Sequence, residues 1–382
     1  MRYYKITFTN PNGKPVANGA NFPASFSSHH DDGTFNPGAL EVEFEISNAF
    51  GHILAAQTHI RIHNPTLEMI QNARQYNGCI CTIEAGFKSG LPLANPNLAG
   101  VVGFGVVQNT FANWMGTDLV LDFLLYASAD FGSPDLAYSV DTGAGSPFPY
   151  SFQWGKGYSS NLIDALKSTF GYQGLTVTGS LNSKLNIQPD PPIKDVKYNF
   201  QTFASFINKM SIGIVDPSDY QKGGQGGNFQ KYPGVSLFYI PGSKQILAYD
   251  GTAAASNKAI NLALEEFIGQ PTWLNSLGVM QSVHPMRSDV SLGFDIQYPS
   301  SLPTLASAQY IGAGRNLLVN PSQGPLRVQQ VRHAGRFRDT SATGWVTYID
   351  AGSAFRVNPN ANEPLSADRV GQVTIGELQT IQ

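Results

Sequence analysis

Strict alternation of apolar and polar residues is the feature that most constrains this chain. From Glu41 to Ile46 the sequence reads EVEFEI, which puts three apolar side chains on one face and three glutamates on the other. The same period of two runs through RYYKITFT at 2–9 and HIRIH at 59–63. Because successive side chains of a strand point to opposite faces, these segments are predicted to be antiparallel strands with one buried face.

A short helix is predicted to interrupt these strands. Asn64 is expected to introduce it, with Pro65 at its first position, and Asn77 and Gly78 are expected to end it. Its apolar face is predicted to hold Leu67, Ile70 and Ala73. Further strands are predicted at 79–87, 101–107 and 118–126. Residues 1–128 are therefore interpreted as a small β-barrel that carries one helix.

The next segment, 129–197, is richer in loops. It contains one amphipathic helix, expected to begin at Ser159 or Ser160 and to end at Gly171. QPDPPIK at 188–194 reads as a Pro-rich linker and indicates a boundary.

Residues 198–270 are predicted to mix helices and strands. Thr202 is expected to cap one helix, and another is expected from Ala259 to Ile268. The Gly-rich segment 222–232 indicates a surface loop, and GVSLFYI and KQILAYD indicate two strands joined by a turn.

The last region, 271–382, is predicted to be β-rich and to close with a hairpin between Gly324 and Ala351. Earlier strands are expected at 277–284, 289–298 and 316–319. The turn of the hairpin is predicted to be a charged elbow made of His333, Gly335, Arg336, Arg338 and Asp339.

Composition bounds the class of protein. Only 13% of the 382 residues are charged, against roughly 25% in typical soluble domains. With 39 Gly and 24 Pro, this indicates much β-structure, many turns and surfaces covered by partners. The length predicts roughly two to four domains. A formal net charge of −3 argues against tight nucleic-acid binding, whereas a near-neutral wall would suit a conduit for DNA because it makes few phosphate contacts.

The cysteines and the absence of long apolar runs indicate the compartment. The sequence shows no charged leader followed by an apolar run and no apolar window of about 18 residues, so a soluble protein without a membrane-spanning segment is expected. Cys79 and Cys81 lie two apart in an alternating segment and are expected on one face of a strand as buried free thiols. Synthesis in a reducing cytoplasm follows.

Two histidine patterns could suggest a metal site. HHDD at 29–32 offers four ligand types, but adjacent residues cannot all turn toward one ion, so a solvated loop is favoured. His59 and His63 have the spacing of a helical zinc pair, but in a strand they would lie about 13 Å apart. No metal ligand is assigned.

The sequence also contains no recognisable catalytic motif. The sequence has no G-x-S-x-G elbow, and GGQGG at 223–227 lacks the Lys-Ser/Thr end of a phosphate loop. Asp118 with Asp122, or Glu265 with Glu266, could supply the two carboxylates of a glycosidase, but nothing distinguishes them from surface acids. No catalytic, cofactor-binding or metal residue is assigned, no cofactor is implied, and the chain is not predicted to be an enzyme.

Two further clusters have a binding and a packing interpretation. Tyr150, Phe152, Trp154 and Tyr158 could form a sugar platform, but core and subunit contacts are favoured. The basic elbow could bind phosphate, but pairing with acidic residues of a neighbouring chain is favoured.

The order of several short motifs resembles one known family. In the N-terminal region these motifs are IRIHN, PTLEMIQNARQY, CTIEAGF and GFGVV; near the C-terminus they are V-x-H-x-G-x-x-R at 331–338 and W-x-T at 345–347. In this order they resemble the tail hub proteins of contractile-tailed phages, the hubs of phage Mu and the T-even phages among them, over about residues 40–350. GRFR at 335–338 stands where the family more often has an acidic residue and a glycine before the arginine, so the ion pairs of the elbow are expected to differ.

The resemblance implies an α+β, β-rich fold with two tube-protein-like β-barrel domains, at 1–128 and 271–382, around mixed α/β middle domains. A weak echo between the first and last regions agrees with such a duplication. The implied protein is a homotrimeric ring in the tail baseplate of the virion, assembled in the host cytoplasm. It would adapt the sixfold tail tube to the threefold central spike and form part of the DNA ejection channel. Its implied partners are the tail tube protein, the spike protein and other baseplate proteins, with DNA only in transit.

Three alternatives stay open. A siphophage tail-associated protein could carry the same fold as an N-terminal module, although no long C-terminal extension is seen in this sequence. A cell-wall or glycan hydrolase of the tail tip is the enzymatic alternative. The hub of a contractile injection system without DNA would have the same sequence features.

Overall fold

A computed structural model gives the fold. It describes residues 1–10, 14, 16, 22–49, 57–90, 95–126, 150–155, 159–170, 176–180, 188–189, 195–200, 214–215, 236–240, 245–249, 259–274, 279–301, 305–307, 317–318 and 325–353. The helix predicted from Thr202 and the Gly-rich loop predicted at 222–232 lie outside these residues.

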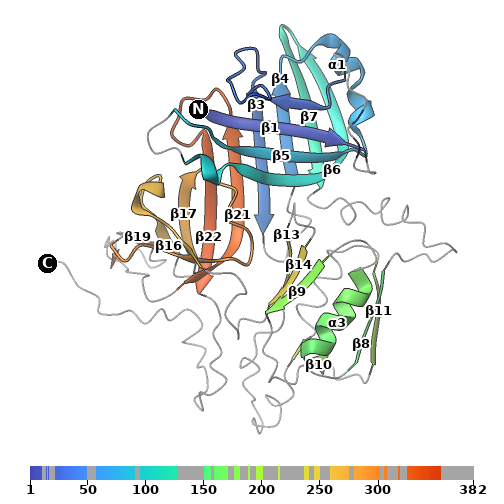
Figure 1. Cartoon of the computed structure of the whole chain (residues 1–382), viewed down its shortest axis with the longest axis vertical. Coiled ribbons are helices and arrows are strands. Elements are labelled where there is room, and N and C mark those ends of the chain that lie inside the picture. The colour runs from blue at the N-terminus through green and yellow to red at the C-terminus, as the bar shows by residue number, and fades with distance from the viewer. Residues whose placement is uncertain are drawn as a thin grey trace.

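One large sheet connects the N-terminal and C-terminal parts of the chain (Figure 1). Its strands follow the order β2-β1-β5-β6-β7-β4-β3-β21-β22-β17-β16-β19-β20, with β15 and β18 joined from the side. All of its pairs are antiparallel except β15 with β18 and β16 with β19. The β-rich class expected from the alternation is confirmed, whereas the division into two barrel domains stays a prediction.

The N-terminal half of the sheet contains the strands predicted from the alternation. They are β1 Arg2–Thr9, β2 Ser25–Ser27, β3 Val42–Ala49, β4 Gln57–His63, β5 Ile80–Phe87, β6 Gly100–Met115 and β7 Asp118–Tyr126. The expected inward residues Val42, Phe44, Ile46, Ile60 and Ile62 are all buried. β7 has the predicted bounds, whereas β6 continues to Met115 instead of ending at Val107.

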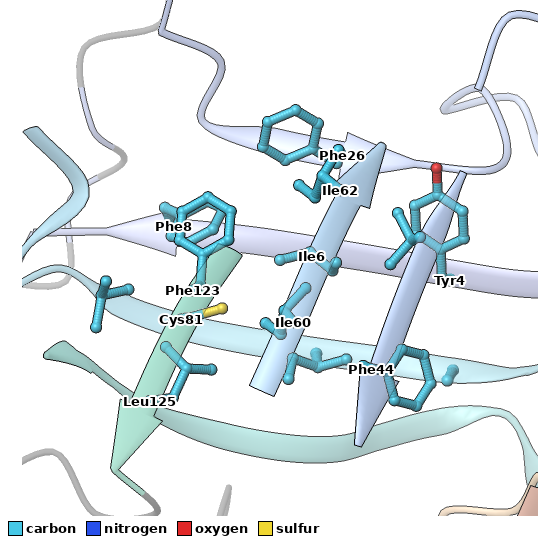
Figure 2. Packing of buried hydrophobic residues seen from close by; sticks show 14 of the residues in the cluster. Tyr4, Ile6, Phe8, Phe26, Phe44, Ile60, Ile62, Cys81, Phe123 and Leu125 are labelled. Carbon is cyan, nitrogen blue, oxygen red and sulfur yellow. The ribbon is translucent and has the colours of Figure 1, made fainter. Parts of the chain in front are cut away.

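The long strand β6 belongs to two layers. Residues Gly100 to Val106 pair with β5, and residues Val106 to Met115 pair with β7, with a bulge between Val107 and Asn109. The two layers enclose an aromatic core in which the rings of Phe8 and Phe123 lie 5.0 Å apart. Figure 2 shows the strand of Phe8 crossing those of Phe44 and Ile60. Burial of these large side chains on both layers is the main stabilising term of this half.

The helix of this half starts later than predicted. Thr66 is its N-cap, with Oγ1 accepting from the amide of Met69 at 3.2 Å, and α1 spans Leu67–Gln71, followed by a 3-10 turn at Ala73–Tyr76. Asn64 and Pro65 precede the helix because the amide of Asn64 donates to Leu119 at 2.8 Å and its φ is +55°. Leu67 is exposed rather than packed, whereas Ala73 is buried as expected.

The C-terminal half of the sheet has shorter strands before its closing hairpin. They are β15 Ile260–Asn261, β16 Thr272–Leu274, β17 Val279–Pro285, β18 Asp295–Gln297, β19 Leu305–Ser307, β20 Leu317–Leu318, β21 Leu326–Arg336 and β22 Trp345–Ser353. The strand predicted at 289–298 is thus reduced to its end, because an ion-paired loop occupies 286–294.

The helix predicted from Ala259 to Ile268 is wrong. Ile260 and Asn261 pair with β18, and only a 3-10 turn, Leu264–Glu266, follows. Backbone hydrogen bonds to neighbouring strands hold the segment in an extended conformation. The amide of Leu262 donates to the carbonyl of Gln297 at 2.9 Å, and the amide of Ile268 donates to that of Val283 at 2.8 Å. Its apolar residues pack onto the C-terminal core in this extended form, so tertiary contacts override the helical spacing.

The predicted charged elbow is also smaller than expected. β21 continues to Arg336, so His333 and Gly335 are ladder residues that pair with Ile46 and Phe44 of β3. Only Arg338 and Asp339 lie in the turn itself. The strand continues because β3 offers it a second pairing partner beyond the hairpin.

The middle of the chain contains the predicted helix and strand pair. Its elements are β8 Tyr150–Gly155, α3 Ser159–Phe170, β9 Thr176–Ser180, β10 Gln188–Pro189, β11 Asp195–Phe200, β12 Ile214–Val215, β13 Ser236–Ile240 and β14 Gln245–Tyr249. α3 begins at Ser159 as expected and buries Leu162 and Leu166. The predicted linker begins in strand β10, which pairs with β12. None of the helices in the described ranges is long and apolar enough to cross a membrane.

The two halves of the sheet meet at a seam, defined here as the pairing of β3 with β21. It runs from Ala49 opposite Gln330 to Glu43 opposite Arg336. At Gly335 a Cβ would lie 2.4 Å from Cζ of Phe44 and 2.8 Å from the Trp345 ring. Phe44 and Trp345 meet edge to face with ring centroids 5.1 Å apart. Only a glycine leaves room for both rings at this position.

We expect Gly335→Ala to destabilise the protein by about 1–3 kcal/mol, because the added methyl overpacks the seam. Gly38→Ala is the matched control: its Cβ would meet only Oδ1 of Asn36, at 3.4 Å, and a change within about 0.5 kcal/mol is expected. Chemical denaturation of both variants measures the difference. Equal stability of the two variants would contradict the account of the seam.

Candidate assembly interface

Five strands of the N-terminal half recur in the C-terminal half. β3, β4, β5, β6 and β7 correspond in chain order to β16, β17, β18, β21 and β22. In each half the first two strands pair with each other, the second pairs with the fifth, the fifth with the fourth and the fourth with the third. All of these pairs are antiparallel. The echo noted in the sequence is therefore present in the topology.

The correspondence extends to single residues of β6 and β21. β6 has a bulge between Val107 and Asn109, and β21 has one between Val328 and Gln330. In both strands the residues before the bulge pair with the shorter neighbour and those after it form the closing hairpin. Residues 109–115 of β6 thus correspond to residues 330–336 of β21.

One of these two stretches is covered and the other is open. Residues 330–336 of β21 pair with β22 on one side and with β3 on the other. Residues 109–115 of β6 pair with β7, but within the described part of the chain no strand pairs with their other side. This open edge exposes Phe111 to 51% and Trp114 to 64%. An uncovered strand with large apolar side chains is a template for pairing with another chain.

The outer face of the sheet, on the side away from the core, carries the polar side chains of β4. Nε2 of His59 lies 2.9 Å from Oδ1 of Asp122, and Nε of Arg61 lies 2.8 Å from the same oxygen. His63 lies 3.4 Å from Glu43. Asp122, one of the carboxylates considered for glycoside hydrolysis, is therefore engaged in a cross-strand ion pair and not in a carboxylate pair with Asp118.

Across the seam, the outer face of the C-terminal strands also carries paired polar and charged side chains. Arg332 of β21 lies 3.2 Å from Glu45 of β3 and stacks 4.2 Å from the ring centroid of Tyr348. Gln281 of β17 donates to Asp350 of β22 at 3.3 Å. Acidic and basic groups of neighbouring strands thus compensate one another over both halves.

The basic elbow finds its acidic partner within the same chain. Arg338 lies 3.6 Å from Glu41, whose Oε1 also accepts from the backbone amide of Arg338 at 3.0 Å. The guanidinium donates to the carbonyl of Ala39 at 2.7 Å. Arg338 thus has an acidic partner within its own chain, because the segment before β3 lies against the turn. Pairing of the elbow with a neighbouring chain stays a prediction.

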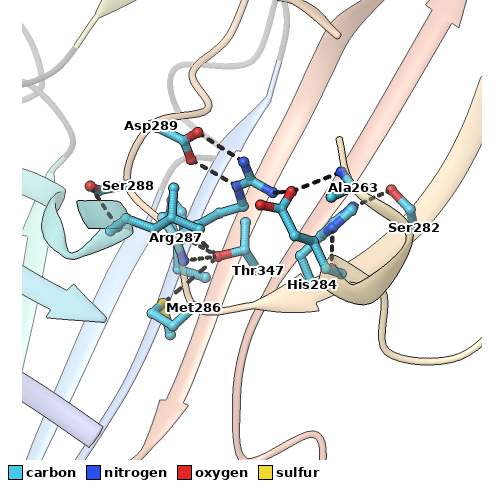
Figure 3. A network of polar contacts seen from close by, with 11 residues as sticks. Ala263, Ser282, His284, Met286, Arg287, Ser288, Asp289 and Thr347 are labelled. Carbon is cyan, nitrogen blue, oxygen red and sulfur yellow. Dashed lines mark hydrogen bonds and ion pairs between the residues drawn. The ribbon is translucent and has the colours of Figure 1, made fainter. Parts of the chain in front are cut away.

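A buried ion-pair network supports the seam from the C-terminal side (Figure 3). Arg287 is 2% exposed and binds Asp289 with two parallel hydrogen bonds of 2.7 and 2.8 Å. Its third contact is Glu266 at 2.9 Å, so this candidate carboxylate is also engaged. The next residue, Ser288, donates from its amide and its hydroxyl to Leu98 of the N-terminal half, both at 2.9 Å. The network thus fixes a loop that ties the two halves together.

Two histidines lie buried beside this network. Nδ1 of His284 lies 2.8 Å from the carbonyl of Glu266, which makes Nδ1 the donor, and Nε2 then accepts from the hydroxyl of Ser282 at 2.8 Å. His333 bonds to Oγ1 of Thr347 at 2.9 Å. Burial lowers the pKa of His284 to about 3, with the neighbouring Arg287 acting in the same direction, and burial lowers that of His333 to about 4. The Ser282–His284 pair is enclosed by Tyr298, which fits a structural role.

The other candidate residues are dispersed. His29 is buried against Ser28, whereas residues 30–32 are exposed, so the segment is only in part the expected solvated loop. Cys79 and Cys81 are buried free thiols, as predicted. No group of three or more His, Cys, Asp or Glu in the described ranges could hold a metal ion. The side chains of the aromatic cluster at 150–158 and the segment GGQGG lie outside the described residues.

The comparisons with known proteins give matches among solved structures only. No family model and no curated protein sequence matches this chain. Among solved structures, the chain is similar to the 43 kDa tail protein of prophage MuSo2 from Shewanella oneidensis, with 8% identity and a TM-score of 0.45 over 93% of this chain and 97% of that one.

Two other solved structures are of the same kind. A tail protein from Neisseria meningitidis is 10% identical, with a TM-score of 0.40 over 92% of this chain and 96% of that one. An E. coli component of the type VI secretion system, described as structurally similar to bacteriophage T4 tail proteins, is 10% identical, with a TM-score of 0.42 over 84% and 77%. These three structures are thus tail proteins and a secretion-system component.

The two buried histidines predict how stability depends on pH. Their pKa values are lower in the folded chain than the ordinary value of 6.5, so the unfolded chain binds more protons and stability falls as pH falls below about 6.5. The loss should reach about 2 kcal/mol for each histidine by pH 5 and level off below pH 4 for His333 and pH 3 for His284. Denaturant titrations between pH 7 and 5, above the main carboxylate range, measure it. A flat profile there would contradict the assignment of two buried neutral histidines.

Loss of the buried guanidinium should be severe. We expect Arg287→Met to cost about 3–5 kcal/mol, because Glu266 and Asp289 would keep their charges without a partner. Arg336→Met, at an exposed position of the seam, should change stability by no more than about 0.5 kcal/mol. Urea denaturation of both variants distinguishes the network from ordinary surface charge, and equal losses would count against it.

Proposed function

We propose that this chain is the structural hub of a phage tail baseplate, in which three copies form a ring that adapts the sixfold tail tube to the threefold central spike. The observation that carries this proposal is the repeat of five strands within one sheet, with one repeat covered at the seam and the other open at residues 109–115 of β6. The order of the motifs in the sequence supports the same assignment.

The repeat supplies the geometry of a symmetry adaptor. Two equivalent five-strand units in each chain become six units in three chains, which a sixfold partner can contact in six similar ways. The seam also shows how neighbouring units join, by pairing of the stretch that follows the bulge. We expect a strand of the next copy to pair with residues 109–115 of β6, in the same way as β3 pairs with residues 330–336 of β21. Such head-to-tail contacts close into a ring when the rotation between copies allows it.

The outer face has the electrostatics that a DNA channel needs. The guanidiniums of Arg61 and Arg332 are held by Asp122 and Glu45 of the same chain. Phosphates would therefore meet paired charges and not a row of free cations, and binding by counterion release would be weak. We assign this face to the lumen of the ring and assign DNA as a partner only in transit.

The open edge makes the ring testable. The purified chain, measured by light scattering over a range of concentrations with and without the tube and spike proteins, is expected to give a species of three times 41.2 kDa. Phe111→Lys with Trp114→Lys should abolish this species, because both charges would lie on the contacted edge.

A control variant separates the edge from general surface hydrophobicity. Leu264 is exposed to 53% in the 3-10 turn that follows β15, and Leu264→Lys should leave the trimer intact. A trimer that survives the double replacement would exclude the open edge as the contact. A chain that stays monomeric even with tube and spike present would argue against the hub, and assays on cell-wall glycans would then test the hydrolase.

A further inference from the structure

A small space lies between the two halves beside the seam. It has a volume of about 30 Å³. β6 contributes residues 101–103 to its wall, the loop after β17 contributes residues 288 and 290–292, and β21 contributes Val331 and His333. The space is therefore bounded by elements far apart in the sequence that the seam brings together.

One ring nitrogen of His333 has no hydrogen-bond partner among the described residues. Its side chain is 3% exposed, and Nδ1 bonds to Oγ1 of Thr347 at 2.9 Å. No hydrogen bond to a described residue is made by Nε2, the ring atom on the opposite side, and the ring borders the space. A ring nitrogen in such a position can still hydrogen-bond to a water molecule that enters the space.

We propose that one ordered water molecule occupies this space and hydrogen-bonds to Nε2 of His333, bridging β21 to the N-terminal half. A water needs about 10–15 Å³ and two to four polar partners. Apart from His333, the polar residues that line the space are Ser288 and Ser291. Ser288 uses its proton on Leu98 and keeps lone pairs that can accept.

Water fits either tautomer of the histidine. If Thr347 donates to Nδ1, then Nε2 carries the proton and donates it to the water. If Nδ1 donates to Thr347, then Nε2 accepts from the water. Residues 101–103 add backbone groups, because β7 pairs with β6 only from Val106 onward. The volume is sufficient for a water molecule.

A density map of the intact protein at about 2 Å resolution or better tests the site directly. We expect a water peak at about 2.7–3.2 Å from Nε2 of His333. A map that shows other buried waters but no density in this space would overturn the proposal.

A solution measurement provides an independent check. Magnetic relaxation dispersion of water oxygen counts water molecules that stay bound for long times. His333→Phe should lower that count by one, whereas His63→Phe, on the outer face, should leave it unchanged. An unchanged count in a folded His333→Phe protein would also overturn the site, and if that variant does not fold, the map of the unaltered protein decides.

Discussion

The seam between β3 and β21 is the contact on which the rest of the structure depends. Its pairing converts two sets of strands, separated by the whole middle of the chain, into one sheet. The indole of Trp345 reinforces it by donating to the carbonyl of Gly86 at 2.9 Å. Arg2 does the same from β1, because its guanidinium donates to the carbonyls of Arg336, Phe337, Asp339 and Ser341. Each of these donors comes from the half that does not contain the acceptor, so neither half completes its polar contacts alone.

Local pattern was sufficient to predict most strands but not their partners. The period of two in β1, β3 and β4 predicted both the strands and their buried faces, because alternation is a property of each strand by itself. The register of β3 against β21 links residues nearly three hundred positions apart, and no local pattern encodes it. The same limit explains why the segment after Ala259 reads as a helix: its apolar spacing is helical, but its backbone partners in β18 and β17 lie elsewhere in the chain.

The polar contacts were harder to predict than the strands. Arg287 sits in a loop sequence, HPMRSD, that would ordinarily be exposed, and only its burial between Glu266 and Asp289 gives it importance. His333 was assigned to a turn because its neighbours are basic, yet it faces inward beside Thr347. The two repeats also carry different residues at equivalent places: Phe111 with Asp122 on one hairpin, and Arg332 with Tyr348 on the other. Duplicated topology therefore left little trace in the sequence.

The composition of the N-terminal core also dictates when this protein can finish folding. Met286, Phe337 and Trp345 belong to the same buried cluster as Tyr4 and Phe44. During synthesis, strands β1 to β7 emerge from the ribosome long before those three residues do. Until the three residues are synthesised, the apolar side chains that they contact in the N-terminal core stay exposed. The chain must therefore pass through a long interval with exposed apolar surface and unpaired strand edges, the situation that recruits chaperones. Slow translation near the C-terminus would lengthen the time for which this apolar surface is exposed. Truncation before Trp345 would leave the core permanently incomplete.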